Sequence, residues 1–316
     1  MNAWSASSDG PSGLPEVQLK AVDVLIVVGC SCAALLLVGP FRWAPGSMTS
    51  ALHYTVFALG PLVLRTLESY FPRQRLLAFM ANFWLLPVVA LGHSMLNPLV
   101  TAVTPVLRDA QLAAMDQRLF GVQASVMLER LLPCWLTEVL LLCYYGYFLW
   151  PLLMGMVLYF TGRREAFDEY LLALGLFFTC NFVFYALMPA IGPRYFLFGS
   201  FTDCLQGLWL TPYLESAMRM PGFAKDCFPS GHTGVTLLVL SYAWRFERRF
   251  FRVMLLPGLG LILATLAGRF HYATDLLCAT PLVLATVGLA MALTRAVAAR
   301  REAEARGVRI NAVARS

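Results

Sequence analysis

Residues 252–294 read RVMLLPGLGLILATLAGRFHYATDLLCATPLVLATVGLAMALT, two long apolar runs around a short polar segment. A helix needs roughly 20 apolar residues to cross a bilayer. The runs at 252–268 and 273–294 come close to that length. We predict two membrane-spanning helices that meet at one face of the membrane.

The remainder of the chain has the same character. Of its 316 residues, 59% are hydrophobic and 13% are charged, against roughly 45–50% and about 25% in soluble domains. This composition excludes a disordered chain and argues against a soluble globule. We predict an all-α fold, a polytopic membrane helical bundle of about eight spans, with six to eight permitted. The predicted spans lie near 21–40, 51–69, 77–97, 135–160, 169–189, 231–246, 252–268 and 273–294.

The stretch 98–130 is too polar to cross a bilayer. We predict that it forms an amphipathic segment at the membrane interface. The predicted organisation therefore has four parts. They are a polar N-terminal tail at 1–20, N-terminal membrane helices with the interfacial segment at 21–130, a catalytic membrane helix bundle at 131–295, and a basic cytoplasmic tail at 296–316.

The positive charge is distributed as in a membrane protein. The net charge is +6, but the basic residues form short clusters between apolar runs and no basic face with interleaved aromatic residues, which argues against nucleic acid as a partner. With a cytoplasmic N-terminus, the cytoplasmic side holds about twice as many Lys and Arg residues as the other side. We predict an integral protein of the inner or plasma membrane with both termini in the cytoplasm. The oligomeric state stays open.

The eight cysteines are too few for a disulfide scaffold, and none has the spacing of a zinc site. We therefore predict no metal and no cofactor. The loop at about 190–229 faces away from the cytoplasm in the predicted topology. If that compartment is oxidising, Cys204 and Cys227 can pair within this loop.

The polar segment between the last two spans carries Arg269, His271 and Asp275. His271 and Asp275 are four residues apart, so on a helix their side chains share one face. A carboxylate bound to one imidazole nitrogen fixes the tautomer and leaves the other nitrogen as a nucleophile or base. The alternative is a His–Asp pair that stabilises the helix end and has no catalytic role.

A second segment, Pro229-Ser230-Gly231-His232, opens the predicted span at 231–246. The N-terminus of a helix presents free N–H groups that bind phosphate, and glycine allows an anion to approach the backbone. Ser230 is a candidate N-cap or phosphate ligand, and His232 could protonate a leaving oxygen. A tight turn followed by a buried histidine is the other interpretation.

A third segment runs from Pro189 to Tyr195 and follows the span near 169–189 on the same predicted side. Arg194 within it could bind phosphate oxygens in a bidentate manner, or be an ordinary interfacial arginine. Because the two spans between His232 and His271 form a helical hairpin, all three segments can share one site. Ionisable residues at a membrane edge are costly, which makes a functional role the first hypothesis.

Together and in this order, the three segments resemble the type 2 phosphatidic acid phosphatase superfamily, which shares its site with the vanadium haloperoxidases. The resemblance implies that His271 forms a phosphohistidine, that Asp275 orients His271 and that His232 is the general acid. It implies a metal-independent reaction. The predicted substrate-binding residues are Arg194, Ser230, Gly231, Arg269, Lys225 and Tyr195.

The sequence departs from the common form of that family at two places. A Lys before Arg194 is missing, and Ala264-Thr265 occupies the place of a Ser-Arg pair, for which Arg269 is the candidate substitute. Three patterns look more like the inositol phosphorylceramide synthase and sphingomyelin synthase branch, whose members move phosphorylated headgroups between lipids. They are Thr265…His271-Tyr272-x-x-Asp275, Asp226-x-x-x-Ser230-Gly231-His232-Thr233 and Met115-Asp116-Gln117-Arg118-Leu119-Phe120-Gly121.

The resemblance therefore implies an integral-membrane phosphatase or phosphotransferase whose partner is a lipid phosphate substrate in the bilayer. Its site would lie on the periplasmic, extracytoplasmic or lumenal face. One alternative is transfer of the phospho-headgroup to a ceramide- or diacylglycerol-like alcohol, and another is a catalytically inactive scaffold. A transporter with a histidine proton relay would need broken helices in paired halves, which the sequence lacks. His53, His93 and the aromatic run 135–150 are interpreted as packing or interface residues.

Overall fold

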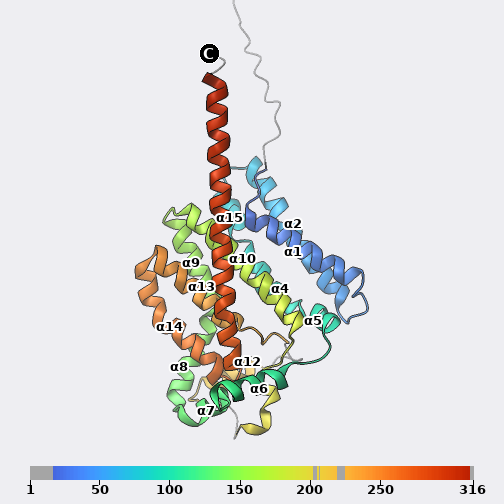
Figure 1. Cartoon of the computed structure of the whole chain (residues 1–316), viewed down its shortest axis with the longest axis vertical. Coiled ribbons are helices and arrows are strands. Elements are labelled where there is room, and N and C mark those ends of the chain that lie inside the picture. The colour runs from blue at the N-terminus through green and yellow to red at the C-terminus, as the bar shows by residue number, and fades with distance from the viewer. Residues whose placement is uncertain (1–16, 202–204, 206, 219–224, 314–316) are drawn as a thin grey trace, which may run out of the picture.

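The computed structural model describes residues 17–201, 205, 207–218 and 225–313. The described residues form helices and no strands, which confirms the predicted all-α fold (Figure 1). Most of the polar tail predicted at 1–20 lies outside the described residues, as does Cys204. The basic tail continues the last helix as far as Val313.

Six helical stretches are long and apolar enough to cross a membrane, which makes the chain an integral membrane protein of the predicted type. A seventh candidate span is a pair of helices with a 46° bend between them, α3 (Arg75–Phe83) and α4 (Leu85–Ser94). The span predicted at 231–246 corresponds to α13 (Gly231–Phe246), whose 16 residues are short for a crossing. The six are α1 (Ala21–Val38), α2 (Ser47–Tyr70), α8 with α9 (Cys134–Tyr145 and Leu149–Phe160, joined by the 3-10 turn Gly146–Phe148), α10 (Arg164–Leu187), α14 (Arg248–Ala267) and α15 (Ala273–Val313) as far as Arg300.

Short helices occupy the segment predicted to lie at the membrane interface. They are α5 (Asn97–Val103), α6 (Asp109–Phe120) and α7 (Ala124–Leu131). The later loop adds α11 (Pro193–Phe196) and α12 (Thr211–Met218). Figure 1 shows α6, α7 and α12 gathered at one end of the bundle, where α14 ends and α15 begins.

The helices that carry the three motifs pack together. Helix α13 packs against both α14 and α15, and α10 packs against α13 and α15. The α13–α14 hairpin returns the chain to the end at which α13 began, as expected. The motif after α10, the motif before α13 and the motif before α15 therefore meet at the same end of the bundle (Figure 1).

Arg65, a charged residue within the second span, is buried together with Asp23, and its other partner Glu68 is half-buried. Its Nε donates to Asp23 Oδ2 at 2.8 Å and its Nη1 donates to Glu68 Oε2 at 2.8 Å. A buried charge persists when it is paired and hydrogen-bonded. This network joins α1 to α2 and allows the apolar run to continue through an arginine.

Candidate active site

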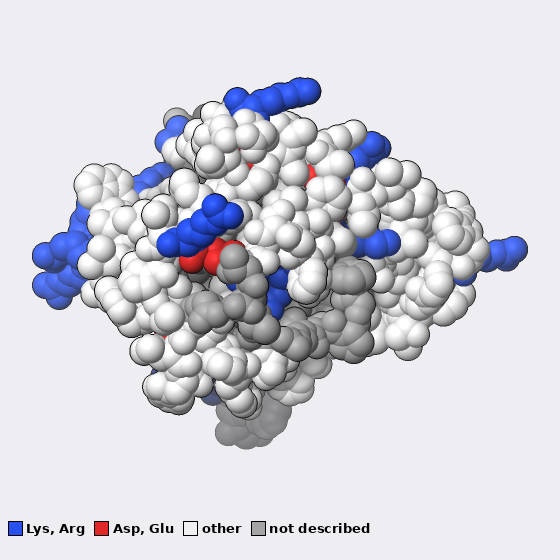
Figure 2. All heavy atoms as spheres, turned by 90° about the horizontal axis from the view of Figure 1, so that it is seen from below, with Lys and Arg blue, Asp and Glu red and all other residues white. Residues whose placement is uncertain are grey.

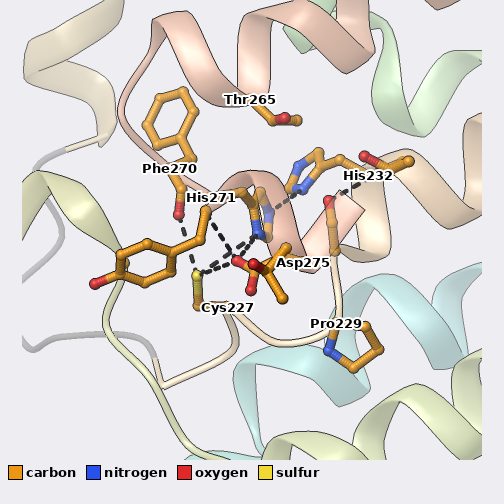
Figure 3. A network of polar contacts seen from close by, with 12 residues as sticks. Cys227, Pro229, His232, Thr265, Phe270, His271 and Asp275 are labelled. Carbon is orange, nitrogen blue, oxygen red and sulfur yellow. Dashed lines mark hydrogen bonds and ion pairs between the residues drawn. The ribbon is translucent and has the colours of Figure 1, made fainter. Parts of the chain in front are cut away.

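His271 is hydrogen-bonded to Asp275 through its Nδ1 atom, which lies 3.3 Å from Asp275 Oδ2 (Figure 3). Both side chains are buried. The predicted pair is present, but not on one helical face, because α15 begins at Ala273 and His271 precedes it. Asp275 lies in the first turn of α15, and its carboxylate accepts the Tyr272 N–H at 2.9 Å while reaching back to His271. Nε2 of His271 is left facing the opposite direction.

The thiol of Cys227 donates to the same carboxylate oxygen. Its Sγ lies 2.9 Å from Asp275 Oδ2 and 3.6 Å from His271 Nδ1 (Figure 3). Burial and the charge of Asp275 raise the pKa of the Cys227 thiol, so the thiol stays protonated and acts as a donor. In the structure Cys227 is a free thiol, and its predicted partner Cys204 lies outside the described residues.

His232 faces His271. Nδ1 of His232 lies 3.4 Å from Nε2 of His271. The imidazole ring of His232 stacks on Tyr144 with 4.5 Å between ring centroids and lies 4.2 Å from the ring of Tyr147. If Nδ1 of His271 donates to the carboxylate, Nε2 holds the lone pair and His232 is the donor in this contact.

The Pro-Ser-Gly turn before His232 is held from two sides. Ser230 is the N-cap of α13, since its Oγ accepts the Thr233 N–H at 3.2 Å. Asn181 of α10 donates to Pro229 O at 3.0 Å. A Cβ atom at Gly231 would lie 2.8 Å from the hydroxyl oxygen of Tyr185, so the close packing of α10 favours glycine there. The predicted role of Ser230 as an N-cap is confirmed.

Arg194 lies in α11, next to the residues that precede His271. Its N–H donates to Arg269 O at 2.7 Å, and its guanidinium lies 5.6 Å from the ring of Phe270. Gly192 before it has a φ of 84°, and a Cβ atom there would clash with Phe270 O. Glycine thus permits the two loops to meet at backbone distance.

Two aspartates of α6 hold these loops in place. Asp109 accepts the N–H groups of Ile191 and Gly192 at 3.0 and 2.9 Å, and the Tyr272 hydroxyl at 3.0 Å. Asp116 accepts the N–H groups of Ala273 and Thr274, both at 2.8 Å, and the Thr274 hydroxyl at 2.6 Å. The interfacial helix therefore joins the Arg194 loop to the start of α15.

For three predicted binding residues, the structure shows other partners or surroundings than His232 and His271. The guanidinium of Arg269 forms a buried ion pair with Glu129 of α7 at 3.1 Å. Nζ of Lys225 donates to Thr101 Oγ1 at 3.0 Å. Tyr195 is exposed at the molecular surface. Whether any of them contacts a substrate stays a prediction.

Thr265, in the place of the family's Ser-Arg pair, supports the loop through its backbone. Its carbonyl accepts the N–H groups of Phe270 and His271 at 2.9 and 3.1 Å. Its hydroxyl donates to Ile262 O at 2.7 Å, within its own helix. The side chain of Thr265 is therefore used inside α14.

His93 lies beside the site, although the sequence interpretation assigned it to packing. Its Nε2 pairs with Asp226 Oδ2. Burial tends to raise the pKa of Asp226, but the hydrogen bond and charge of His93 outweigh burial, so the pKa lies below its usual value. The ring of His93 also contacts Phe182 and Tyr185 of α10, at 6.2 and 6.4 Å between centroids.

Cys227 Sγ, His271 Nδ1 and Asp275 Oδ2 lie within 4.8 Å of one another, close enough to share a metal ion. Metal binding would need a thiolate and a bare Nδ1 atom. Here the thiol is a protonated donor and Nδ1 is in contact with the carboxylate. These three atoms therefore fit a hydrogen-bonded triad better than a set of metal ligands.

Comparison with protein families places the sequence of this chain in a known group. A model of the PAP2 superfamily matches residues 110–289. No curated protein and no solved structure matches the chain. The match covers more than half of the chain and includes α6 from its second residue and all three motif segments. The chain belongs to the PAP2 superfamily.

Proposed function

We propose that the chain is an enzyme that cleaves a phosphoester or diphosphate bond of an amphipathic lipid, with His271 as the nucleophile. The observation that carries this proposal is the order of contacts from Asp275 to His271 Nδ1, and from His271 Nε2 to His232. One nitrogen of the nucleophile is oriented by a carboxylate and the other faces a second imidazole. Membership of the PAP2 superfamily supports phosphatase-type chemistry.

In the first step, Nε2 of His271 attacks phosphorus and the bond from phosphorus to the lipid oxygen breaks. His232 gives its proton to that oxygen, which leaves as an alcohol, or as a phosphate if the substrate is a diphosphate. Because Nδ1 of His232 and Nε2 of His271 are 3.4 Å apart, the His232 ring has to move aside as the phosphoryl group enters. Asp275 stabilises the positive charge on the phosphorylated imidazole.

In the second step, water attacks phosphorus and gives a proton to His232. The nitrogen–phosphorus bond breaks and inorganic phosphate leaves. In this proposal, Arg194 and the N–H groups at the start of α13 hold the phosphoryl oxygens. Figure 2, which views the α6–α7 end, shows separate basic side chains on a face with few acidic atoms, as suits an anionic headgroup.

Transfer of the phosphoryl-containing headgroup to a lipid alcohol is the second candidate. It is favoured by aromatic rings near His232, which would limit the access of water. The rings of Tyr144 and Tyr147 contact His232, and Phe270 stacks on Tyr144. The predicted topology puts most Lys and Arg residues on the cytoplasmic side of the membrane and the three motifs on the opposite side. This charge distribution supports a site on the periplasmic, extracytoplasmic or lumenal face.

The test is phosphate release by the detergent-purified protein and its His271→Ala variant, across lipid phosphates and polyprenyl diphosphates without added metal. Lipid products are analysed in parallel. Release that the variant loses supports the phosphatase, and a new phospholipid without free phosphate supports the transferase. Equal inactivity of both proteins across the panel would contradict both and favour an inactive scaffold.

A further inference from the structure

An apolar pocket of about 430 Å³ lies between the N-terminal helices and α10. The N-terminal helices that line it all precede residue 110, where the family match begins. Helices α1, α2, α4 and α5 form one side, and α10 forms the other. Its walls include Ile26, Gly29 and Ala33 of α1, Val88 of α4, and Phe178 and Phe182 of α10.

The walls of the pocket are formed by apolar side chains and the thiols of Cys30 and Cys32. The two hydroxyl groups among the lining residues are already hydrogen-bonded. The Tyr54 hydroxyl donates to Gly92 O at 3.0 Å, and the Thr179 hydroxyl donates to Gly175 O at 2.8 Å. Such a lining suits an alkyl chain, because no buried polar group loses a partner when the chain enters.

The pocket opens at the surface of the bundle. Leu36, Val103, Val183 and Leu187 belong to its lining, and each is more than a third exposed. These side chains come from helices that are candidate membrane spans or lie next to them. A hydrocarbon chain can therefore enter the pocket sideways from the bilayer.

One layer of aromatic side chains separates the pocket from the catalytic motif. Gly92 and Phe182 line the pocket, and His93 follows Gly92 and contacts Phe182. The ring of His93 also contacts Tyr185, whose hydroxyl lies against Gly231. The pocket thus lies beside the residues that precede His232.

We propose that this pocket binds a hydrocarbon chain of the lipid phosphate whose headgroup reaches His271. The proposal rests on the proposed function, because it identifies the pocket's occupant as the substrate of that site. Because the chain comes from the bilayer and not from water, its packing against the pocket walls determines which chains fit. The N-terminal helices then select substrates by their chain, while the matched region 110–289 carries the chemistry.

The test uses two photoactivatable probes in phosphatidylcholine nanodiscs, dodecyl phosphate and dodecanol, each with a diazirine at the last carbon. All labelling is done in the His271→Ala background, so that dodecyl phosphate is not hydrolysed to dodecanol. We expect dodecyl phosphate to label peptides of α1 and α10 at least about fivefold more strongly than dodecanol, because only the phosphate is held at the catalytic end. Excess dioctanoyl phosphatidate should remove this difference. Equal labelling by both probes would overturn the proposal, since the pocket would then be a general lipid site.

Gly29→Phe fills the pocket, because no atom lies within 4 Å of a Cβ placed at Gly29. Gly288→Phe on α15 is the matched control, with the same open space and no part in the pocket. We expect the first variant to lose the phosphate-dependent labelling and the second to keep it. Ala33→Leu, also in the wall, gives a second test if Gly29→Phe does not fold. Retained labelling in a folded pocket variant would overturn the proposal.

The two proposals fail in different ways. His271→Ala should abolish phosphate release and leave the labelling of α1 and α10 intact, because labelling requires no chemistry. Phosphate-dependent labelling without any release would contradict the proposed function and leave the pocket assignment standing. Release that depends on His271, together with labelling confined to other helices, would overturn the pocket assignment alone.

Discussion

Nε2 of His271 lies 3.4 Å from Nδ1 of His232, although α13, α14 and the turn after them separate the two residues in the chain. The contact exists because the α13–α14 hairpin brings the chain back to the end at which α13 starts. Nδ1 of His271 is in contact with Asp275 on the other side of the ring. The two imidazoles and the carboxylate therefore form one continuous chain of polar contacts.

Asp275→Asn should lower kcat by about 10²–10⁴-fold, with a smaller change in KM. The amide has one acceptor oxygen where the carboxylate has two, and it carries no charge to stabilise the His271 imidazolium. Steady-state kinetics on the substrate found in the release assay measures the effect. The double variant with His271→Ala should be no slower than His271→Ala alone, since the two residues act as a unit. Additive losses would contradict the coupling.

Cys227→Ala should reduce kcat by about tenfold, because the Asp275 carboxylate loses a donor at 2.9 Å. Cys227→Ser keeps a donor and should retain most of the activity. The control is Cys180→Ala, a partly buried cysteine of α10. A serine variant as slow as the alanine variant would show that packing of the sulfur matters and its hydrogen bond does not.

Asp116→Ala should destabilise the protein by about 2–4 kcal/mol, since it leaves two N–H groups and a hydroxyl at the start of α15 without their charged acceptor. His271 lies two residues before Ala273, so kcat should fall more than KM rises. Thermal unfolding and kinetics in detergent check both effects. Glu165→Gln, at an exposed position of α10, is the control and should change neither. Unchanged stability would contradict the conclusion that α6 holds the start of α15 in place.

The pair of Asp226 and His93 predicts a pH dependence of stability. Because the folded protein lowers the pKa of Asp226, the pair stabilises the fold above the ordinary aspartate pKa of about 3.9. This contribution is lost as the pH falls below that value and through the lower pKa of the folded state. We expect Asp226→Asn to have a lower Tm than the wild type at about pH 5–7, and the difference to disappear toward about pH 3. A difference that persists at the acidic end would contradict this account.

The spans and the three motifs were predictable because each depends on neighbours within about one helix length. Apolar runs identify membrane helices directly, and Pro229-Ser230-Gly231-His232 contains its own N-cap. The bend between α3 and α4 occurs at Trp84, which packs against Gly60 of α2. Pro87 lies three residues later and cannot donate the helical hydrogen bond to Phe83 O, which accounts for the break.

The residues that the sequence did not indicate contact the site from distant segments. Asp109 lies 163 positions from Tyr272, and no local pattern shows that a carboxylate in an interfacial helix holds the start of α15. His93 and Cys227 also act through partners on other elements. The direction of Arg269 depends on a left-handed backbone, with φ of 65°, and on Glu129 in α7. Such contacts follow from the tertiary packing.

The most direct measurement is mass spectrometry of the peptide that contains His271, after rapid quenching of the enzyme with a substrate from the release assay. The account predicts a phosphoryl group on His271, formed in the wild type and absent from His271→Ala, which also releases no phosphate. Phosphate release at the wild-type rate by His271→Ala, or a phosphoryl group on another residue, would contradict the central claim.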